Sequence, residues 1–291
     1  MKPAKFDYFR ADTAVEAVEA LSANPDSKIM AGGQSLVPLM NMRLAVPSAL
    51  VDISRVAELS GIDANGALRI GAVTSQRDVL ASTAVQQGWP LITAALRHVG
   101  HPATRARGTF GGSVAHADPA AELPAVMLAL DATITVTGAS ERSVPAEGFF
   151  AGPFTTTMAD DELLAEVSIP DMSDRFWGFG EVARRHGDYA LTGAAVSLRA
   201  DGEGTVTDAR VALFSVSGTA VRAATAEAGL VGTPLGSEDV AARAGQAALD
   251  GVEIAADSFV SAGYRRDATA AVVKRALLEA ATNPKGTSHG S

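Results

Sequence analysis

The chain has no cysteine among its 291 residues. Without thiols it cannot form a disulfide, use a cysteine nucleophile or hold an iron–sulfur cluster through thiolates of its own. If such a cluster exchanges electrons with this chain, another polypeptide must carry it.

Long apolar runs and excess positive charge are also missing. No stretch reaches the roughly 20 apolar residues that cross a bilayer, and residues 1–7 lack the apolar core of a signal peptide. The formal net charge of −9 argues against a nucleic-acid or anionic-membrane partner. We therefore expect a cytoplasmic protein without a membrane span. A hydrophobic content of 47% is enough for the cores of two or three small domains.

Glycine, by contrast, is abundant, and two glycine-rich segments stand out. Residues 31–35 read Ala-Gly-Gly-Gln-Ser, and residues 108–113 read Gly-Thr-Phe-Gly-Gly-Ser. Paired glycines allow a positive φ and a close approach to a ligand, so that consecutive N–H groups can converge on anionic oxygens. A single Gly-Gly pair is more often an ordinary turn. One such loop suggests a phosphate site, and two suggest a pyrophosphate site.

Several motifs along nearly the whole chain resemble one protein family. They are residues 31–43, 50–53 (Leu-Val-Asp-Ile), 70–72 (Ile-Gly-Ala), 108–124, 185–190 (Arg-His-Gly-Asp-Tyr-Ala), 264–266 (Tyr-Arg-Arg) and 274–277 (Lys-Arg-Ala-Leu). In this order they resemble the flavoprotein (medium) subunit of molybdenum hydroxylases. That group includes carbon monoxide dehydrogenase, nicotine dehydrogenase and the flavin domain of xanthine dehydrogenase.

The resemblance implies that this chain binds FAD through both glycine segments. The first segment would wrap the pyrophosphate with backbone N–H groups and the Ser35 hydroxyl. The second matches the family's Thr-x-Gly-Gly signature from Thr109 to Gly112. Ser113 stands where relatives often have asparagine, so the resemblance leaves its contact open. The residues implied to bind the cofactor are Ala31, Gly32, Gly33, Gln34, Ser35, Leu36, Thr109, Phe110, Gly111, Gly112, Ser113, His116, Asp118, Glu122, Asp188 and Tyr189.

For two pairs of residues in this set, the resemblance implies a contact with the flavin, but a purely structural role is the alternative. Asp118 and Glu122 resemble acidic contacts to the ribityl and ring side of the flavin. Otherwise Asp118 belongs to an Asp-Pro turn, and Glu122 is a carboxylate favoured at the start of a helix. Asp188-Tyr189 resembles a dipeptide whose aromatic ring covers one face of the isoalloxazine, with a core tyrosine as the alternative. Some relatives have a lysine on the preceding strand, but residues 179–181 read Phe-Gly-Glu, so no effect of that lysine is predicted.

The resemblance implies an α+β protein with a two-lobed FAD-binding domain of the vanillyl-alcohol-oxidase (PCMH) type. A capping box at Thr13 opens a helix in lobe 1, residues 1–57, where strands are expected at 28–31 and 50–53. An Asn65-Gly66 turn predicts a hairpin that opens lobe 2, residues 58–172. Lobe 2 is expected to contain helices near 76–81, 90–99 and 120–130 and a strand at 133–137.

The polar residues 170–174 predict a linker to a C-terminal domain at 173–285. The resemblance implies that this domain is of the CO-dehydrogenase flavoprotein type. This domain should have a three-stranded antiparallel sheet, with strands at 176–182, 194–199 and 206–216. Helices are expected near 220–228, 238–249 and 263–281. We expect a frayed tail near residues 284–291, with the domain boundary at 286.

Two competing motifs are weaker. Residues 178–183 match a dinucleotide fingerprint, but a turn follows them where that motif needs a helix, so a strand with small residues is the better interpretation. The spacing of His98 with His101, and of His116 with Asp118, could suggest a metal, yet no third ligand follows at a diagnostic spacing. We therefore predict neither a metal site nor a catalytic side chain in this chain.

The function implied by the resemblance is electron transfer through FAD within a molybdenum hydroxylase. The implied partners are a small subunit with [2Fe–2S] clusters and a large subunit with molybdopterin cytosine dinucleotide, assembled as a dimer of heterotrimers. The sequence names neither the substrate nor the final electron acceptor. A self-contained FAD-dependent oxidase and a non-catalytic assembly subunit remain as alternatives.

Overall fold

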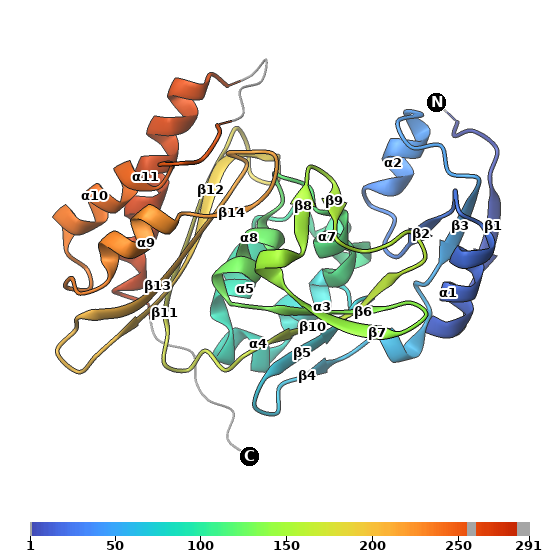
Figure 1. The fold of residues 1–291 in the computed structure, drawn as a ribbon, viewed down its shortest axis with the longest axis horizontal. Helices are drawn as coiled ribbons and strands as arrows, with labels where there is room; N and C mark the ends of the chain where they lie inside the picture. The colour runs from blue at the N-terminus through green and yellow to red at the C-terminus, as the bar shows by residue number, and fades with distance from the viewer. Residues whose placement is uncertain (1, 255–259, 284–291) are drawn as a thin grey trace.

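The structure is a computed structural model that describes residues 2–254 and 260–283. Three main β-sheets follow one another along the chain and lie side by side in space (Figure 1). We call them the N-terminal, central and C-terminal sheets. The expected tail lies outside the described residues. None of the described helices is both long enough and apolar enough to cross a membrane.

The N-terminal sheet is parallel, with the strand order β1-β3-β2. Its strands are β1 (Asp7–Arg10), β2 (Lys28–Met30) and β3 (Ala49–Asp52), and its helices are α1 (Ala14–Ala23) and α2 (Leu36–Asn41). The Thr13 hydroxyl accepts a hydrogen bond from the Glu16 N–H, which confirms the helix start expected from the capping box. Strand β1 was not expected, because its four residues are all exposed and show no alternation.

The central sheet is antiparallel, with the order β4-β5-β10-β6-β7. Its strands are β4 (Ile62–Asp63), β5 (Leu68–Gly71), β6 (Thr133–Thr137), β7 (Glu141–Pro145) and β10 (Leu163–Ile169). The hairpin expected at Asn65-Gly66 joins β4 to β5, with Gly66 at a φ of +82°. A small hairpin of β8 (Phe150–Gly152) and β9 (Thr155–Thr156) lies before β10, and short 3-10 turns occur at η1 (Ala57–Leu59) and η2 (Ala146–Gly148).

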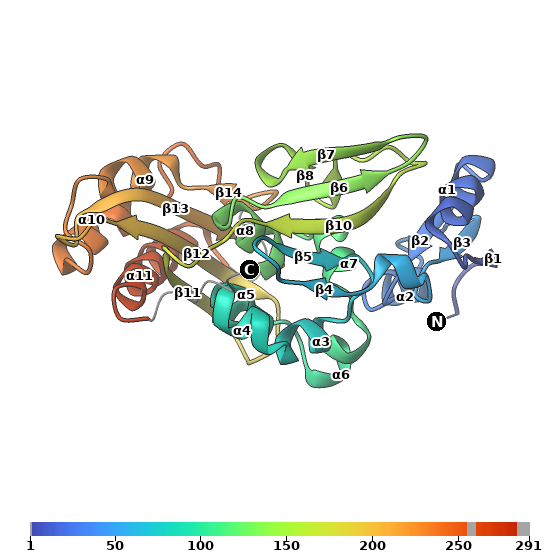
Figure 2. The ribbon, with the colours of Figure 1, turned by 90° about the horizontal axis from the view of Figure 1, so that it is seen from below.

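Six helices connect β5 to β6 (Figure 2), and all of them except α6, which has no buried residue, contribute to one hydrophobic core with the central sheet. They are α3 (Gln76–Ala81), α4 (Thr83–Gly88), α5 (Pro90–Leu96), α6 (Pro102–Arg107), α7 (Phe110–His116) and α8 (Glu122–Ala129). Every residue of α8 is buried, which fits its lack of a polar face. This helix lies between the central sheet and the C-terminal sheet.

The C-terminal sheet has four antiparallel strands, not the three expected. They are β11 (Phe176–Ala183), β12 (Ala190–Ala200), β13 (Val206–Phe214) and β14 (Val221–Arg222), followed by α9 (Ala224–Leu230), α10 (Glu238–Ala247) and α11 (Ala262–Ala280). Strand β14 occupies the start of a segment expected to be helical. The antiparallel pairing of Val221 with Leu213 of the preceding strand β13 overrides the helical preference expected there.

Both faces of the C-terminal sheet are covered, which explains the small residues in its strands. One face packs on α9, α10 and α11, and the other joins the core of the central sheet through Phe179 and Phe214. A Cβ added at Gly178 would overlap the Ala276 carbonyl oxygen of α11. The glycines of the apparent dinucleotide fingerprint therefore allow a helix to pack closely on β11, which is a strand as expected.

Ion pairs reinforce the contact between the central and C-terminal sheets. Asp131, just after α8, accepts hydrogen bonds from the Arg210 guanidinium of β13 at 2.9 and 3.1 Å. Arg175, in the segment that joins β10 to β11, donates to Asp208 at 2.7 Å. The N-terminal sheet has a smaller core of its own, to which Leu163 of β10 contributes.

Candidate functional site

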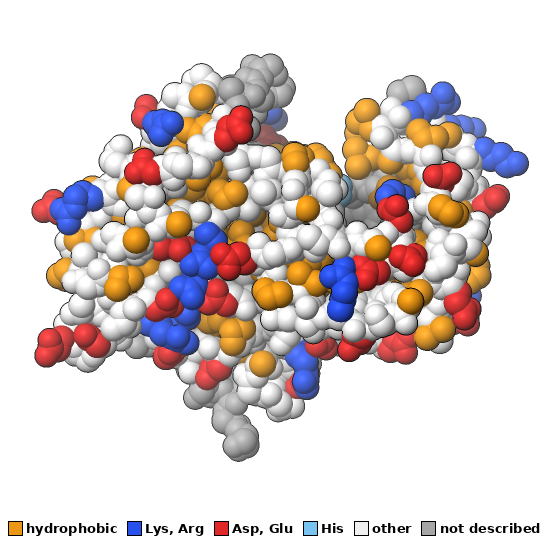
Figure 3. Space-filling model, in the orientation of Figure 1, with side chains coloured by type: hydrophobic (Ala, Val, Ile, Leu, Met, Phe, Trp, Pro, Cys, Tyr) orange, Lys and Arg blue, Asp and Glu red, His pale blue; other side chains and the backbone are white. Residues whose placement is uncertain are grey.

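A cavity of about 820 Å³ lies between the N-terminal sheet and the helices of the central sheet. In the space-filling view the surface is hollowed at this place (Figure 3). The volume falls within the ~300–1,000 Å³ that is usual for cofactor and ligand pockets. The cavity is bounded by the β2–α2 turn, by α7 with the segment that leads to α8, by the β8–β9 hairpin and by the β11–β12 loop.

The structure brings almost all of the predicted site residues to this cavity. Those that line it are Ala31, Gly32, Gly33, Gln34, Ser35, Leu36, Thr109, Gly111, Gly112, Ser113, His116, Asp118, Glu122, Asp188 and Tyr189. Phe110 does not line it. As the first residue of α7 it turns its ring into the core of the central sheet, where the side chain is fully buried.

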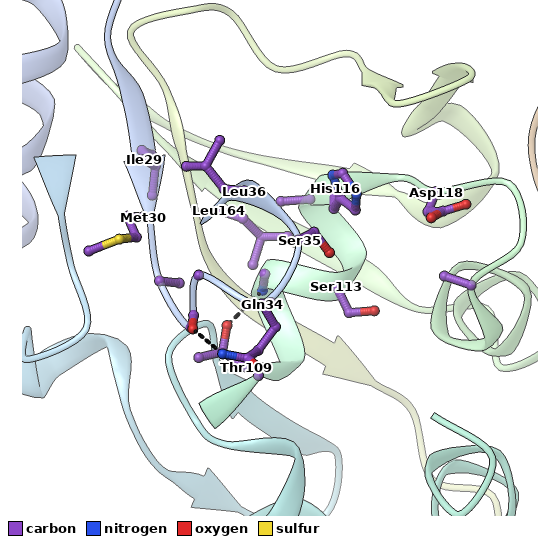
Figure 4. Close-up of a pocket in the computed structure, with 18 of the residues that line it drawn as sticks. Ile29, Met30, Gln34, Ser35, Leu36, Thr109, Ser113, His116, Asp118 and Leu164 are labelled. Atoms are coloured by element: carbon purple, nitrogen blue, oxygen red, sulfur yellow. Dashed lines mark hydrogen bonds between the residues drawn. The ribbon is translucent and has the colours of Figure 1, made fainter. Parts of the chain in front are cut away.

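The first glycine segment is a turn between β2 and α2. Gly33 has a φ of +68°, a conformation that suits glycine. A Cβ at Gly32 would overlap the Arg107 carbonyl oxygen, so this turn packs directly against the residues that precede the second glycine segment. Gln34 turns back and donates from Nε2 to the Gly32 carbonyl oxygen at 3.1 Å (Figure 4).

The backbone N–H groups of this turn form a consecutive row of hydrogen-bond donors. Among the residues that the structure describes, none accepts a hydrogen bond from the N–H of residues 32–36. Backbone donors normally find partners when they are removed from water. This row of donors, at the wall of a cavity, therefore suits an anionic ligand group.

The second glycine segment is not the loop that we expected. Residues 110–116 form helix α7, and the Thr109 hydroxyl caps it by accepting from the Gly112 N–H at 3.0 Å (Figure 4). The Gly111 N–H donates to the Ala72 carbonyl oxygen at 3.0 Å, and Gly111 lacks room for a Cβ because Ala72 lies against it. These glycines allow close packing and do not adopt positive φ. The N–H groups of Gly108 and of residues 110–113 are already used, so the contribution of these residues to a ligand comes from their surface and from the Ser113 side chain.

Two acidic residues and a histidine line the wall beyond α7. Asp118 accepts from the Ala120 N–H at 2.9 Å, so the expected Asp-Pro turn and the cavity position are both present. Glu122 is only 8% exposed, and burial, with smaller contributions from the charges of Glu181 and Asp118, raises its pKa to about 8. Burial also lowers the pKa of His116, whose ring lies 5.2 Å from that of Phe154. Near neutral pH the wall therefore carries a protonated carboxyl and a neutral imidazole.

Tyr189 is not a core residue, so that alternative was wrong. Its side chain is 70% exposed in the β11–β12 loop, at the edge of the cavity and next to Asp188. An aromatic ring held in this position can cover a flat ligand that enters the cavity.

Sequence reasoning missed several lining residues. Ile29 and Met30 of β2 and Leu164 of β10 contribute apolar surface (Figure 4). Met158, after β9, adds to this surface, and Lys28 contributes a cation. Leu164 reaches the cavity because β10 lies between β5 and β6 in the central sheet. No local sequence pattern predicts that pairing. Across residues 2–254 and 260–283, no group of three or more His, Asp or Glu side chains is arranged to hold a metal ion.

The fold and the cavity thus define an α+β cofactor-binding protein. Residues 4–172 match the family described as "FAD binding domain in molybdopterin dehydrogenase", and residues 177–280 match the "CO dehydrogenase flavoprotein C-terminal domain". The 6-hydroxypseudooxynicotine dehydrogenase complex subunit alpha of Paenarthrobacter nicotinovorans is 40% identical over 96% of both chains. The carbon monoxide dehydrogenase medium chain of Hydrogenophaga pseudoflava is 37% identical over 95% of this chain and 97% of the other.

Solved structures agree with these matches. Carbon monoxide dehydrogenase from Hydrogenophaga pseudoflava superposes with a TM-score of 0.93 at 38% identity, covering 96% of this chain and 98% of the other. Quinoline 2-oxidoreductase from Pseudomonas putida 86 gives 0.92 at 39% identity, covering 97% and 99%. The chain belongs to the family of FAD-binding medium subunits of molybdenum hydroxylases, as the sequence motifs indicated.

Proposed function

We propose that this chain binds FAD in the cavity and transfers electrons from partner subunits to an external acceptor. The observation that carries the proposal is the row of N–H groups at residues 32–36, which lack acceptors among the described residues and lie at the cavity wall. A pyrophosphate needs such donors, and neutral N–H groups can hold it without a cluster of lysines. Because the chain belongs to a family of FAD-binding subunits, we propose that the pyrophosphate belongs to FAD.

The residues that line the cavity fit this cofactor. Residues 31–36 would hold the pyrophosphate, and Thr109 with residues 111–113 would form the surface opposite. His116, Asp118 and Glu122 would face the ribityl chain and the ring, and Tyr189 with Asp188 would cover one face of the ring. FAD supplies the redox chemistry when bound, because it accepts and releases electrons singly or in pairs.

The protein contributes position and a defined protonation state. The protonated Glu122 carboxyl can donate a hydrogen bond to a ring acceptor, whereas an ionised carboxylate could only accept one. His116, neutral near pH 7, would add no positive charge beside the ribityl chain and the ring. The Tyr189 ring, at the edge of the cavity, would shield one face of the bound ring from water.

We further propose that the chain works in the cytoplasm with two kinds of partner subunit. With no cysteine, the chain cannot hold an iron–sulfur cluster through thiolates of its own, so the clusters would reside on a small subunit. The molybdenum cofactor and the substrate site would reside on a large subunit, in a dimer of heterotrimers. Lobe 1 at 1–57, lobe 2 at 58–172 and the C-terminal domain at 173–285 remain our division of the chain.

The test has two arms. The chain produced alone should retain FAD after desalting, with flavin absorption at about one equivalent, and should show no substrate-dependent reduction of that flavin. Produced together with the small and large subunits, it should support dye reduction by a substrate, tested with N-heterocycles, aldehydes and carbon monoxide. A chain without flavin bands would be an assembly subunit, and flavin reduction by substrate in the isolated chain would identify a self-contained oxidase.

A further inference from the structure

An aromatic residue at the cavity has a backbone conformation that does not suit it. Phe154, at the tip of the β8–β9 hairpin, has a φ of +53°. A bulky side chain is strained in this left-handed region. Pro153 precedes it, and in a turn with proline second and a positive φ third, glycine or asparagine normally takes the third position. The hairpin tip therefore has a phenylalanine where local turn chemistry favours a smaller residue.

Burial does not explain the phenylalanine. Phe154 is 58% exposed, so its ring adds little to the hydrophobic core. It lines the cavity instead, and its ring packs on the ring of His116 at an angle of 47°, with the two centroids 5.2 Å apart. His116 lies at the end of α7 and projects toward the cavity (Figure 4). The Phe154 ring thus extends the cavity wall that His116 begins.

Neighbouring segments hold the hairpin tip in place. The Phe154 N–H donates to the carbonyl oxygen of Ala117, the C-cap of α7, at 3.0 Å. A Cβ at Gly218 would lie 3.1 Å from the Pro153 Cγ, so the segment between β13 and β14 packs against the tip. At the base of the hairpin, Phe149 is fully buried in the core of the central sheet. Strained residues persist where the surrounding structure fixes them in this way, and they cluster at ligand sites.

We infer that Phe154 is a positioning residue for FAD, with its ring held in advance over the part of the cofactor that lies beside His116. This inference rests on the proposed function. FAD leaves the cavity only when the hairpin tip moves, so the ring acts mainly on the rate of dissociation. The backbone strain is present in the FAD-free chain, and contact between the ring and the cofactor offsets it. Removal of the ring should therefore have opposite effects on the FAD-free and the FAD-loaded chain.

The first experiment separates this role from a structural one and uses the FAD-free chain. Phe154→Gly and Phe154→Asn remove the ring and introduce residues that tolerate a positive φ. Their melting temperatures should equal or exceed that of the parent. The matched control is Arg43→Gly, because Arg43 has a φ of +60° but does not line the cavity. A melting temperature below that of the parent in either Phe154 variant would mean that the ring supports the fold, and overturns the inference.

The second experiment measures the dissociation of FAD from the loaded chain. Dissociation after dilution is followed by the fall in flavin fluorescence anisotropy. It should be about tenfold faster in Phe154→Gly and Phe154→Asn, because contact with one aromatic ring contributes roughly that factor and changes in affinity appear mostly in the dissociation rate. Phe154→Tyr keeps the ring and should match the parent rate, as should Arg43→Gly.

Two results of this second experiment overturn the inference alone. They are a parent-like rate in the variants without the ring, and fast dissociation in Phe154→Tyr. A parent chain that retains no FAD would overturn the proposed function as well, so the two failures are distinguishable.

Discussion

The contact between the two glycine segments leads to a quantitative prediction for Gly32→Ala. The added Cβ would overlap the Arg107 carbonyl oxygen and lie 2.8 Å from the Gly108 Cα. Both atoms belong to backbone just before the Thr109 cap of α7, so they cannot move aside as a flexible side chain could. The β2–α2 turn must instead shift away from residues 107 and 108, which precede helix α7.

The free-energy cost of that shift can be estimated from the known cost of adding atoms to a close-packed region. Extra methyl groups in close-packed regions cost about 1–3 kcal/mol. At 1.4 kcal/mol for each factor of ten, this corresponds to roughly 5- to 150-fold weaker FAD binding, if the bound state needs the parent arrangement of the turn. The substitution leaves every polar side chain of the cavity in place, so the effect should appear in affinity and not in the flavin's absorption maximum.

Titration of the FAD-free protein with FAD, followed by calorimetry or by quenching of flavin fluorescence, measures this affinity. Gly148→Ala is the matched control, because a Cβ at Gly148 meets no heavy atom within 4 Å and the residue does not have a positive φ. The control should bind FAD as the parent does. An unchanged affinity in Gly32→Ala would refute the reasoning, since it would mean that the turn does not need its close contact with the backbone of Arg107 and Gly108 to bind the cofactor.

Three further outcomes are expected. Glu122 ionises near its ordinary pKa of 4.5 in the unfolded chain but only near 8 when folded, so folding binds a proton and stability falls as the pH rises between these values; Glu122→Gln should therefore raise the melting temperature of the FAD-free chain most at alkaline pH, and an equal shift at all pH values would contradict the assignment. Tyr189→Ala should change flavin fluorescence and slow turnover more than it weakens FAD binding, and unchanged spectra and kinetics would remove the residue from the site. Gly178→Ala should lower the free energy of unfolding by about 1–3 kcal/mol in urea titration, because its Cβ overlaps the Ala276 carbonyl oxygen, whereas Gly202→Ala, which meets no atom, should leave it unchanged.

Local signals in the sequence predicted the elements that depend on local chemistry. The Thr13 cap, the Asn65-Gly66 hairpin and strand β6 follow from capping, turn and alternation rules, and the structure confirms each of them. The missed strand β10 is held by β5 and β6, which lie far away in the sequence, so its pairing leaves no local trace.

The site shows the same division between local and distant information. Residues 31–36, 109 and 188–189, which the motifs assigned to one site, line one cavity. The second glycine segment, which we expected to be a loop, forms most of helix α7 with its N-cap. The signal for helix α7 was present: a threonine directly before an apolar run is a typical N-cap. The glycines at 111 and 112 argued against a helix in the sequence. They are needed because Ala72 and the Thr109 hydroxyl lie too close to leave room for a Cβ, and only the folded chain shows these contacts.

The small core of the N-terminal sheet has a consequence for building chimeras within this family. Leu163, a residue of β10, is fully buried among side chains of the N-terminal sheet and its helix α1, such as Leu21 and Val51. A donor segment that ended near residue 57 would leave this packing position behind, and a unit of that size has little apolar surface to lose. Exchange of the N-terminal unit between relatives must therefore carry matching residues at the start of β10, although more than a hundred positions separate the two pieces along the chain.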